Sequence, residues 1–108
     1  MNNVVLVGRL TSNPEIVDRL GKKVTSVTLA VTRNFKSPEG IYETDFVRCV
    51  LWNAIADATC EYCKSGDIVG IKGRLQSSTY EDEDNKKHYA LEVVAEKVTF
   101  LSSKKADE

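Results

Sequence analysis

Apolar and polar side chains alternate along most of this sequence, and this period of two restricts the chain to a fold built mainly from β-strands. The alternation predicts five strands, at roughly residues 4–10, 23–35, 44–52, 68–80 and 88–100. Residues 53–64 depart from it and are predicted to form the one helix, with Asn53 as its N-terminal cap and Gly66 as its stop. Tyr62 falls on the apolar stripe of this helix and is expected to pack into the core.

Three strands, a helix and two further strands, in that order, match the five-stranded Greek-key barrel called the OB-fold. With 108 residues, the chain is long enough for one such domain with a modest core. We therefore predict an all-β OB-fold domain over residues 1–101, followed by a short polar tail over residues 102–108 that is expected to be disordered. In this fold the ligand crosses the second and third strands.

The third predicted strand carries an unusual set of side chains on one face. Alternation places Phe46, Arg48 and Trp52 together there, whereas the opposite face is apolar and is interpreted as core. Flat rings beside a permanent cation suit unpaired nucleic acid, because every base has a face to stack and every linkage carries a negative phosphate. Strands favour aromatic residues in any case, so for one isolated ring barrel packing is the preferred interpretation.

The fourth predicted strand repeats the pattern, with Lys72 and Arg74 on the face that ends at Tyr80. Because stacking contributes about 1–3 kcal/mol per base, several such rings together favour binding over packing. The predicted stacking residues are Phe35, Phe46, Trp52 and Tyr80. The predicted phosphate-binding residues are Arg33, Lys36, Arg48, Lys72 and Arg74.

The overall charge argues against a generally basic nucleic-acid-binding protein, because the net charge of the chain is −1. The acid is concentrated toward the end: residues 1–80 have a net charge of +2 and residues 81–108 a net charge of −3. A local basic groove is compatible with this distribution, with weaker electrostatic help than in a basic protein.

Metal sites, cofactors and catalysis are not predicted. Cys60 and Cys63 have a C-x-x-C spacing but no second pair nearby, and zinc takes four ligands, so reduced structural thiols are expected. His88, the one histidine, is expected to be solvated or hydrogen-bonded and not catalytic, and the acidic run at residues 81–84 is expected to be solvated. No enzyme motif is present, and a nuclease using the acidic run is a distant alternative. Without a signal peptide or an apolar run of membrane-spanning length, a cytoplasmic protein with no membrane partner is expected.

Several blocks of the sequence are shared with a known family. NVVLVGRLT at 3–11, TDFVRCVLW at 44–52 and GIKGRL at 70–75, with shorter blocks at 61–67 and 78–82, resemble bacterial single-stranded DNA-binding proteins over roughly residues 2–101. The resemblance implies sequence-independent binding of single-stranded DNA in replication, recombination, repair or competence. It further implies a homotetramer in the bacterial cytoplasm, either associated with the nucleoid or encoded by a phage or plasmid, and base stacking at the positions of the four rings named above.

Two departures from the family pattern matter. Ser77 and Ser78 stand where the family often has arginine or lysine, so fewer ionic contacts and a shallower salt dependence are expected. The sequence ends at Glu108 without the acidic tip that recruits replication and repair enzymes, so such recruitment is not implied here. Two alternatives stay open: a dimeric accessory protein of the primosome type, and a barrel that binds proteins but no nucleic acid.

Overall fold

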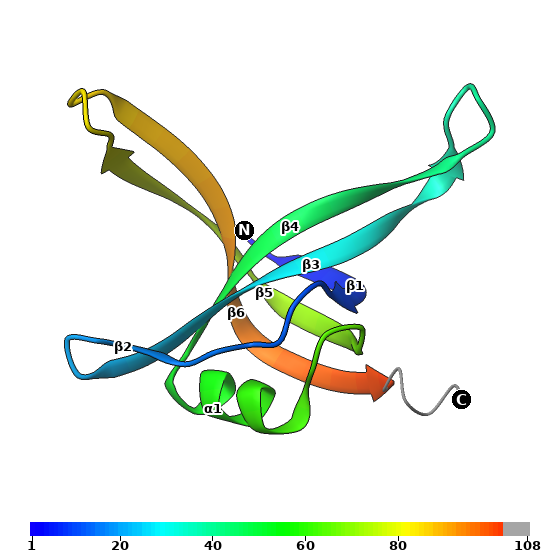
Figure 1. Cartoon of the computed structure of the whole chain (residues 1–108). Helices are drawn as coiled ribbons and strands as arrows, with labels where there is room; N and C mark the ends of the chain where they lie inside the picture. The colour runs from blue at the N-terminus through cyan, green and yellow to red at the C-terminus, as the bar shows by residue number, and fades with distance from the viewer. Residues whose placement is uncertain (103–108) are drawn as a thin grey trace.

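The computed structural model describes residues 1–102 (Figure 1). The tail predicted for residues 102–108 lies outside the described residues, apart from Ser102, which ends the last strand. Within residues 1–102, six strands and one helix follow one another: β1 (Val4–Leu10), β2 (Val17–Arg19), β3 (Lys22–Lys36), β4 (Tyr42–Trp52), α1 (Asn53–Tyr62), β5 (Ile68–Glu81) and β6 (Lys87–Ser102).

Five of the strands, all except β2, form a closed barrel, and the predicted OB-fold is confirmed. The strand order is β1-β5-β6-β4-β3-β2, and β1 closes the barrel because it also pairs with β3, where Leu10 lies opposite Leu29. β4 and β6 are parallel neighbours, with Cys49 beside Val93, and the other pairs are antiparallel. Gly8 lies where β1 passes β3, and a Cβ atom there would clash with the Ala30 carbonyl oxygen.

One strand, β2, was not among the five predicted from the sequence. It pairs with the start of β3, so that Arg19 lies opposite Lys22 across a tight turn. Gly21 takes a φ of 81° in this turn, and its amide donates to the Asp18 carboxylate at 3.0 Å. All three residues of β2 are exposed, so hydrophobic alternation gives no signal for this strand.

The core confirms most of the inner faces that alternation assigned, but Leu75, which alternation places on the same face as Ile71, is 41% exposed. The largest fully buried side chains of the core come from four of the barrel strands and the helix: Leu29, Leu51, Ile71, Val69, Val93, Thr25, Thr59 and Cys49. Because the inner face of β4 is filled in this way, its other face must point away from the barrel.

The helix is confirmed between β4 and β5, but two details of the prediction were wrong. The N-cap position is Trp52, with no side-chain cap hydrogen bond, and Asn53 has a left-handed φ of 52° inside the element. Tyr62, the last residue of the helix, is 67% exposed and is not part of the core. Its ring contacts that of Phe100, with the centroids 5.9 Å apart. Ala56 and Thr59 form the buried face instead.

Two hairpins extend away from the barrel in different directions (Figure 1). We call them the β3–β4 arm and the β5–β6 arm. The first ends in a turn in which the amide of Ser37 donates to the Ile41 carbonyl at 2.7 Å. The second ends in a turn in which the amide of Asp82 donates to the Lys86 carbonyl at 3.0 Å. In the described part of the chain, no helix is long and apolar enough to cross a membrane.

Candidate nucleic-acid interface

The four predicted stacking rings all lie on the outside of the molecule. Phe35 is 62% exposed, Phe46 68%, Trp52 37% and Tyr80 57%. Phe46 and Trp52 project from the outer face of β4, which runs from the β3–β4 arm down to the helix (Figure 1). Phe35 lies on the same arm, near the end of β3, and Tyr80 lies on the β5–β6 arm. None of the four rings is fully packed in the core, so each has surface on which a base could stack.

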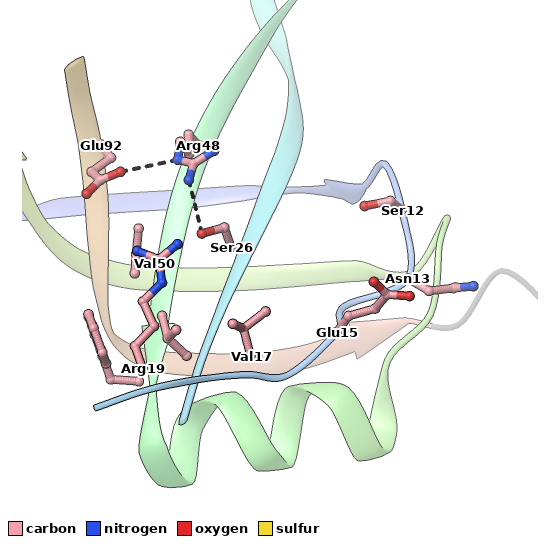
Figure 2. A pocket seen from close by; sticks show the side chains of 11 residues that line it. Ser12, Asn13, Glu15, Val17, Arg19, Ser26, Arg48, Val50 and Glu92 are labelled. Carbon is pink, nitrogen blue, oxygen red and sulfur yellow. Dashed lines mark hydrogen bonds and ion pairs between the residues drawn. The ribbon is translucent and has the colours of Figure 1, made fainter. Parts of the chain in front are cut away.

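Trp52 forms part of the wall of a hollow of about 340 Å³ beside the barrel, which we call the Trp52 hollow. The segment after β1, together with β2, faces the outer sides of β3, β4 and β6 across it (Figure 2). Its lining residues are Ser12, Asn13, Glu15, Val17, Arg19, Val24, Ser26, Arg48, Val50, Trp52 and Glu92.

Arg48 is held at the edge of this hollow by two neighbours (Figure 2). Its Nε donates to Glu92 Oε2 at 3.2 Å, and its Nη2 donates to Ser26 Oγ at 3.3 Å. The Glu92 side chain is only 15% exposed, whereas that of Arg48 is 59% exposed. The guanidinium is therefore open to a ligand on one side and neutralised by a carboxylate on the other.

Arg33, on the β3–β4 arm, is also paired with carboxylates. Its Nε donates to both Asp45 oxygens, at 3.2 and 3.1 Å, and its Nη1 donates to Glu43 at 2.7 Å. The hydrogen bond from Arg33 lowers the pKa of Asp45 below its ordinary value, and the same bond raises the pKa of Arg33. Lys36 lies further along the arm, with its Nζ 5.5 Å from the centroid of the Tyr42 ring.

The structure separates the two predicted cations of β5. Arg74 lies in register with Val94 of β6, which in turn lies beside Val50 of β4, so its side chain shares the outer face that carries Arg48. Its Nη1 donates to Gln76 at 2.7 Å. Lys72 lies opposite Val5 of β1 and lines a different hollow, so the structure does not bring it together with Trp52.

Tyr80 is paired in register with His88 across the β5–β6 arm, and the two rings are stacked. Their centroids are 5.1 Å apart and their planes differ by 19°. His88 Nε2 lies 2.6 Å from Asp82 Oδ2. His88 was expected to be solvated or hydrogen-bonded, and it contacts Asp82 in this way; its stacking on Tyr80 was not predicted.

Sequence reasoning missed Ser26 and Glu92, the two partners of Arg48, as residues of this region. The β5–β6 hairpin register, in which Glu92 lies opposite Gln76, is a local signal that could have placed Glu92 on the outer face. Its contact with Arg48 depends on the parallel pairing of β4 and β6, which no local pattern indicates. In the described residues, no three His, Cys, Asp or Glu side chains are grouped so that they could hold a metal ion.

The closed barrel defines an OB-fold protein, with exposed rings on the outer face of β4 and on the two arms. The family model described as "Single-strand binding protein family" matches residues 1–101. The chain is 47% identical over 105 residues to "Single-stranded DNA-binding protein 3" of Listeria innocua, covering 96% of this chain and 66% of that protein. It is 44% identical over 104 residues to "Single-stranded DNA-binding protein B" of Bacillus subtilis, covering 95% of this chain and 92% of that protein.

A third relative, "Single-stranded DNA-binding protein" of Enterococcus faecalis, is 41% identical over 109 residues. The match covers this whole chain and 58% of that protein. The chain thus spans about two thirds or less of the Listeria and Enterococcus relatives, and most of the Bacillus one. The chain belongs to the single-strand binding protein family.

Proposed function

We propose that this chain binds single-stranded DNA without sequence preference, by stacking bases on exposed rings and neutralising phosphates with nearby cations. The observation that carries the proposal is the outward position of Phe35, Phe46, Trp52 and Tyr80 on the β4 face and the two arms. The names of the relatives support single-stranded DNA as the ligand. No catalytic step is part of the proposal, since stacking and ion pairing need none.

The stacking rings are spread over a long curved surface, not gathered in one pocket. Phe46 and Trp52 are six residues apart on one strand, which corresponds to about 20 Å at the rise of a β-strand. A strand of DNA crossing the β4 face would therefore meet these two rings at separate bases. Because every base has a flat face, this arrangement tolerates any sequence.

The predicted cations would contribute in different ways. Three of the cations have no carboxylate partner among the contacts described above. Lys36 lies over the Tyr42 ring, Lys72 lines the second hollow, and Arg74 donates to the side-chain amide of Gln76. Arg33 and Arg48 already pair with carboxylates, so part of their charge is neutralised before a phosphate arrives. We infer that stacking supplies more of the affinity than charge does.

We also propose that the chain assembles into a homotetramer, in the bacterial cytoplasm, that acts in replication, recombination, repair or competence. An apolar surface outside the barrel supports association: Val5 is 72% exposed, Val7 55% and Leu101 51%. These side chains line a shallow hollow of about 330 Å³ on β1, β5 and β6. Exposed apolar side chains grouped in this way are typical of protein–protein contacts.

Titration with oligo-dT tests the proposed function. Trp52 is the one tryptophan, so a base stacked on it should quench the fluorescence of the protein. A Trp52→Ala, Phe35→Ala double variant should bind at least about tenfold more weakly in a mobility-shift assay, since two stacking contacts are lost. Absence of both quenching and a mobility shift in the wild-type protein would favour the protein-binding barrel instead.

Sedimentation with and without oligo-dT tests the assembly. A tetramer in both states supports the proposal. A stable dimer would favour the accessory protein of the primosome type, and would leave the proposed DNA binding untouched.

A further inference from the structure

Tyr80, His88 and Asp82 form a continuous stack of contacts at the end of the β5–β6 arm, which we call the Tyr80 stack. One face of the Tyr80 ring lies against the imidazole of His88, at a centroid distance of 5.1 Å. The imidazole in turn contacts Asp82 Oδ2 through Nε2 at 2.6 Å. Tyr80 remains 57% exposed, so its ring is supported from one side and open to a base on another.

Asp82 is fixed by the turn it belongs to. Its Oδ1 accepts hydrogen bonds from the backbone amides of Asp84 at 2.9 Å and Lys86 at 3.0 Å. Asn85, with a φ of 60°, donates its amide to the Asp82 carbonyl at 3.0 Å. The hydrogen bond from His88, followed by those from the amides, lowers the pKa of Asp82, so this residue is a carboxylate over the working pH range. Its second oxygen is thereby directed at His88.

The charges around the stack make the end of this arm acidic. Residues 81–87 contain four acids and two lysines, a net charge of −2. Asp82 and Tyr80 are the groups in contact with the imidazole. Glu81 and Lys87 form the next register pair, so they project to the opposite face of the hairpin, and Glu83 and Asp84 lie in the turn. With a neutral imidazole, the Asp82–His88 pair has a charge of −1 beside the ring.

We propose that His88 is a DNA-binding residue of the Tyr80 stacking site, and that protonation of its imidazole strengthens binding of single-stranded DNA there. The inference rests on the proposed function and adds a residue and a pH dependence to it. A proton on His88 cancels the charge of Asp82, retains the hydrogen bond between them, and places a cation under the ring on which a base stacks. The phosphates flanking that base then approach a site that no longer repels them.

Oligo-dT binding measured through Trp52 fluorescence at constant ionic strength, from about pH 5.5 to 8, tests this inference, because histidine changes charge in that range. Thymine has no group that titrates there, and His88 is the one histidine of the chain. We expect binding about two- to fivefold tighter at the acidic end, which is the scale of one exposed charge pair.

Two variants separate the roles of ring and charge. His88→Phe retains a flat ring under Tyr80 and cannot titrate, so its affinity should not vary with pH and should equal that of the wild type at the alkaline end. His88→Arg carries a permanent charge and should bind at all pH values about as tightly as the wild type at the acidic end. The stack lies at the end of an arm, so neither change removes a core contact.

A proton NMR titration gives a second reading on the unaltered protein. If DNA binding favours the protonated ring, then by reciprocity the imidazole signals of His88 should change at a higher pH with oligo-dT than without it. A wild-type affinity that does not vary with pH, or a pH dependence that His88→Phe retains, would overturn the inference while leaving DNA binding intact. Absence of oligo-dT binding at every pH would instead overturn the proposed function.

Discussion

Replacing Phe46 with alanine isolates the contribution of one stacking ring. Its side chain is 68% exposed, so about a third of it is covered in the free protein. Full burial of a phenylalanine contributes about 1.5–3 kcal/mol, so the substitution should cost about 0.5–1 kcal/mol of stability and the barrel should remain folded. Loss of one stacked base should cost about 1–3 kcal/mol of binding free energy, which is about 5- to 150-fold in Kd.

The assay uses a reporter that the substitution leaves in place. Trp52 lies on the same face of β4, so quenching by oligo-dT measures binding to Phe46→Ala and to the wild type with the same signal. Phe46→Tyr keeps a flat ring and should bind like the wild type.

Phe100→Ala is the matched control, because Phe100 is similarly exposed at 45% but contacts Tyr62 beside the helix. The reasoning is refuted if Phe46→Ala binds as tightly as the wild type. It is equally refuted if Phe100→Ala loses as much affinity as Phe46→Ala.

Three further outcomes follow from the surroundings of single residues. Glu92→Gln removes the charge that neutralises Arg48, so oligo-dT should bind several-fold more tightly. The slope of log K against log salt should also steepen by about 0.7, because Arg48 then neutralises one more phosphate. Equal slopes in the variant and the wild type would contradict this. Gly73→Ala would place a Cβ atom against the Val94 carbonyl oxygen, too close for an ordinary contact. It should therefore lower the free energy of unfolding by about 1–3 kcal/mol, and an unchanged thermal midpoint would count against the close approach. Burial raises the pKa of Cys49 to about 11, so alkylation followed by mass spectrometry should find this thiol unmodified in the native protein and modified once it unfolds.

The outward position of Phe46 and Trp52 could be predicted because alternation has only two outcomes. Once Cys49 and Leu51 are assigned to the core, Phe46 and Trp52 must lie on the other face. Phe35 has the same parity as the buried Val27 and Leu29, so alternation alone does not place its ring outward. Alternation cannot predict whether another part of the protein covers the apolar face of a strand. Leu91 has the same parity as buried Val93, yet it is 65% exposed, because the β5–β6 arm continues beyond the barrel.

The partners of the cations could not be predicted for a different reason. The pairing of Arg33 with Asp45 depends on the exact register of a hairpin, in which Val31 lies opposite Asp45. The pairing of Arg48 with Glu92 depends on two strands that are parallel, with the two residues 44 positions apart in the chain. A shift of one residue in either register would move these side chains to the opposite face of the sheet, so that the pairs would no longer meet. The composition of the chain contains no information on register.

The chain has a net charge of −1, and its ion pairs further reduce the positive charge that is available to bind DNA, a polyanion. Arg33 and Arg48 pair with carboxylates within the chain, so part of their charge is already neutralised when a phosphate approaches. The net electrostatic gain of a phosphate contact is therefore smaller than for a cation previously surrounded by water and salt. The ring of Phe46 faces no such competition, because a base that stacks on it displaces only water. We therefore expect stacking to supply most of the affinity, with the cations placing the DNA backbone beside the rings.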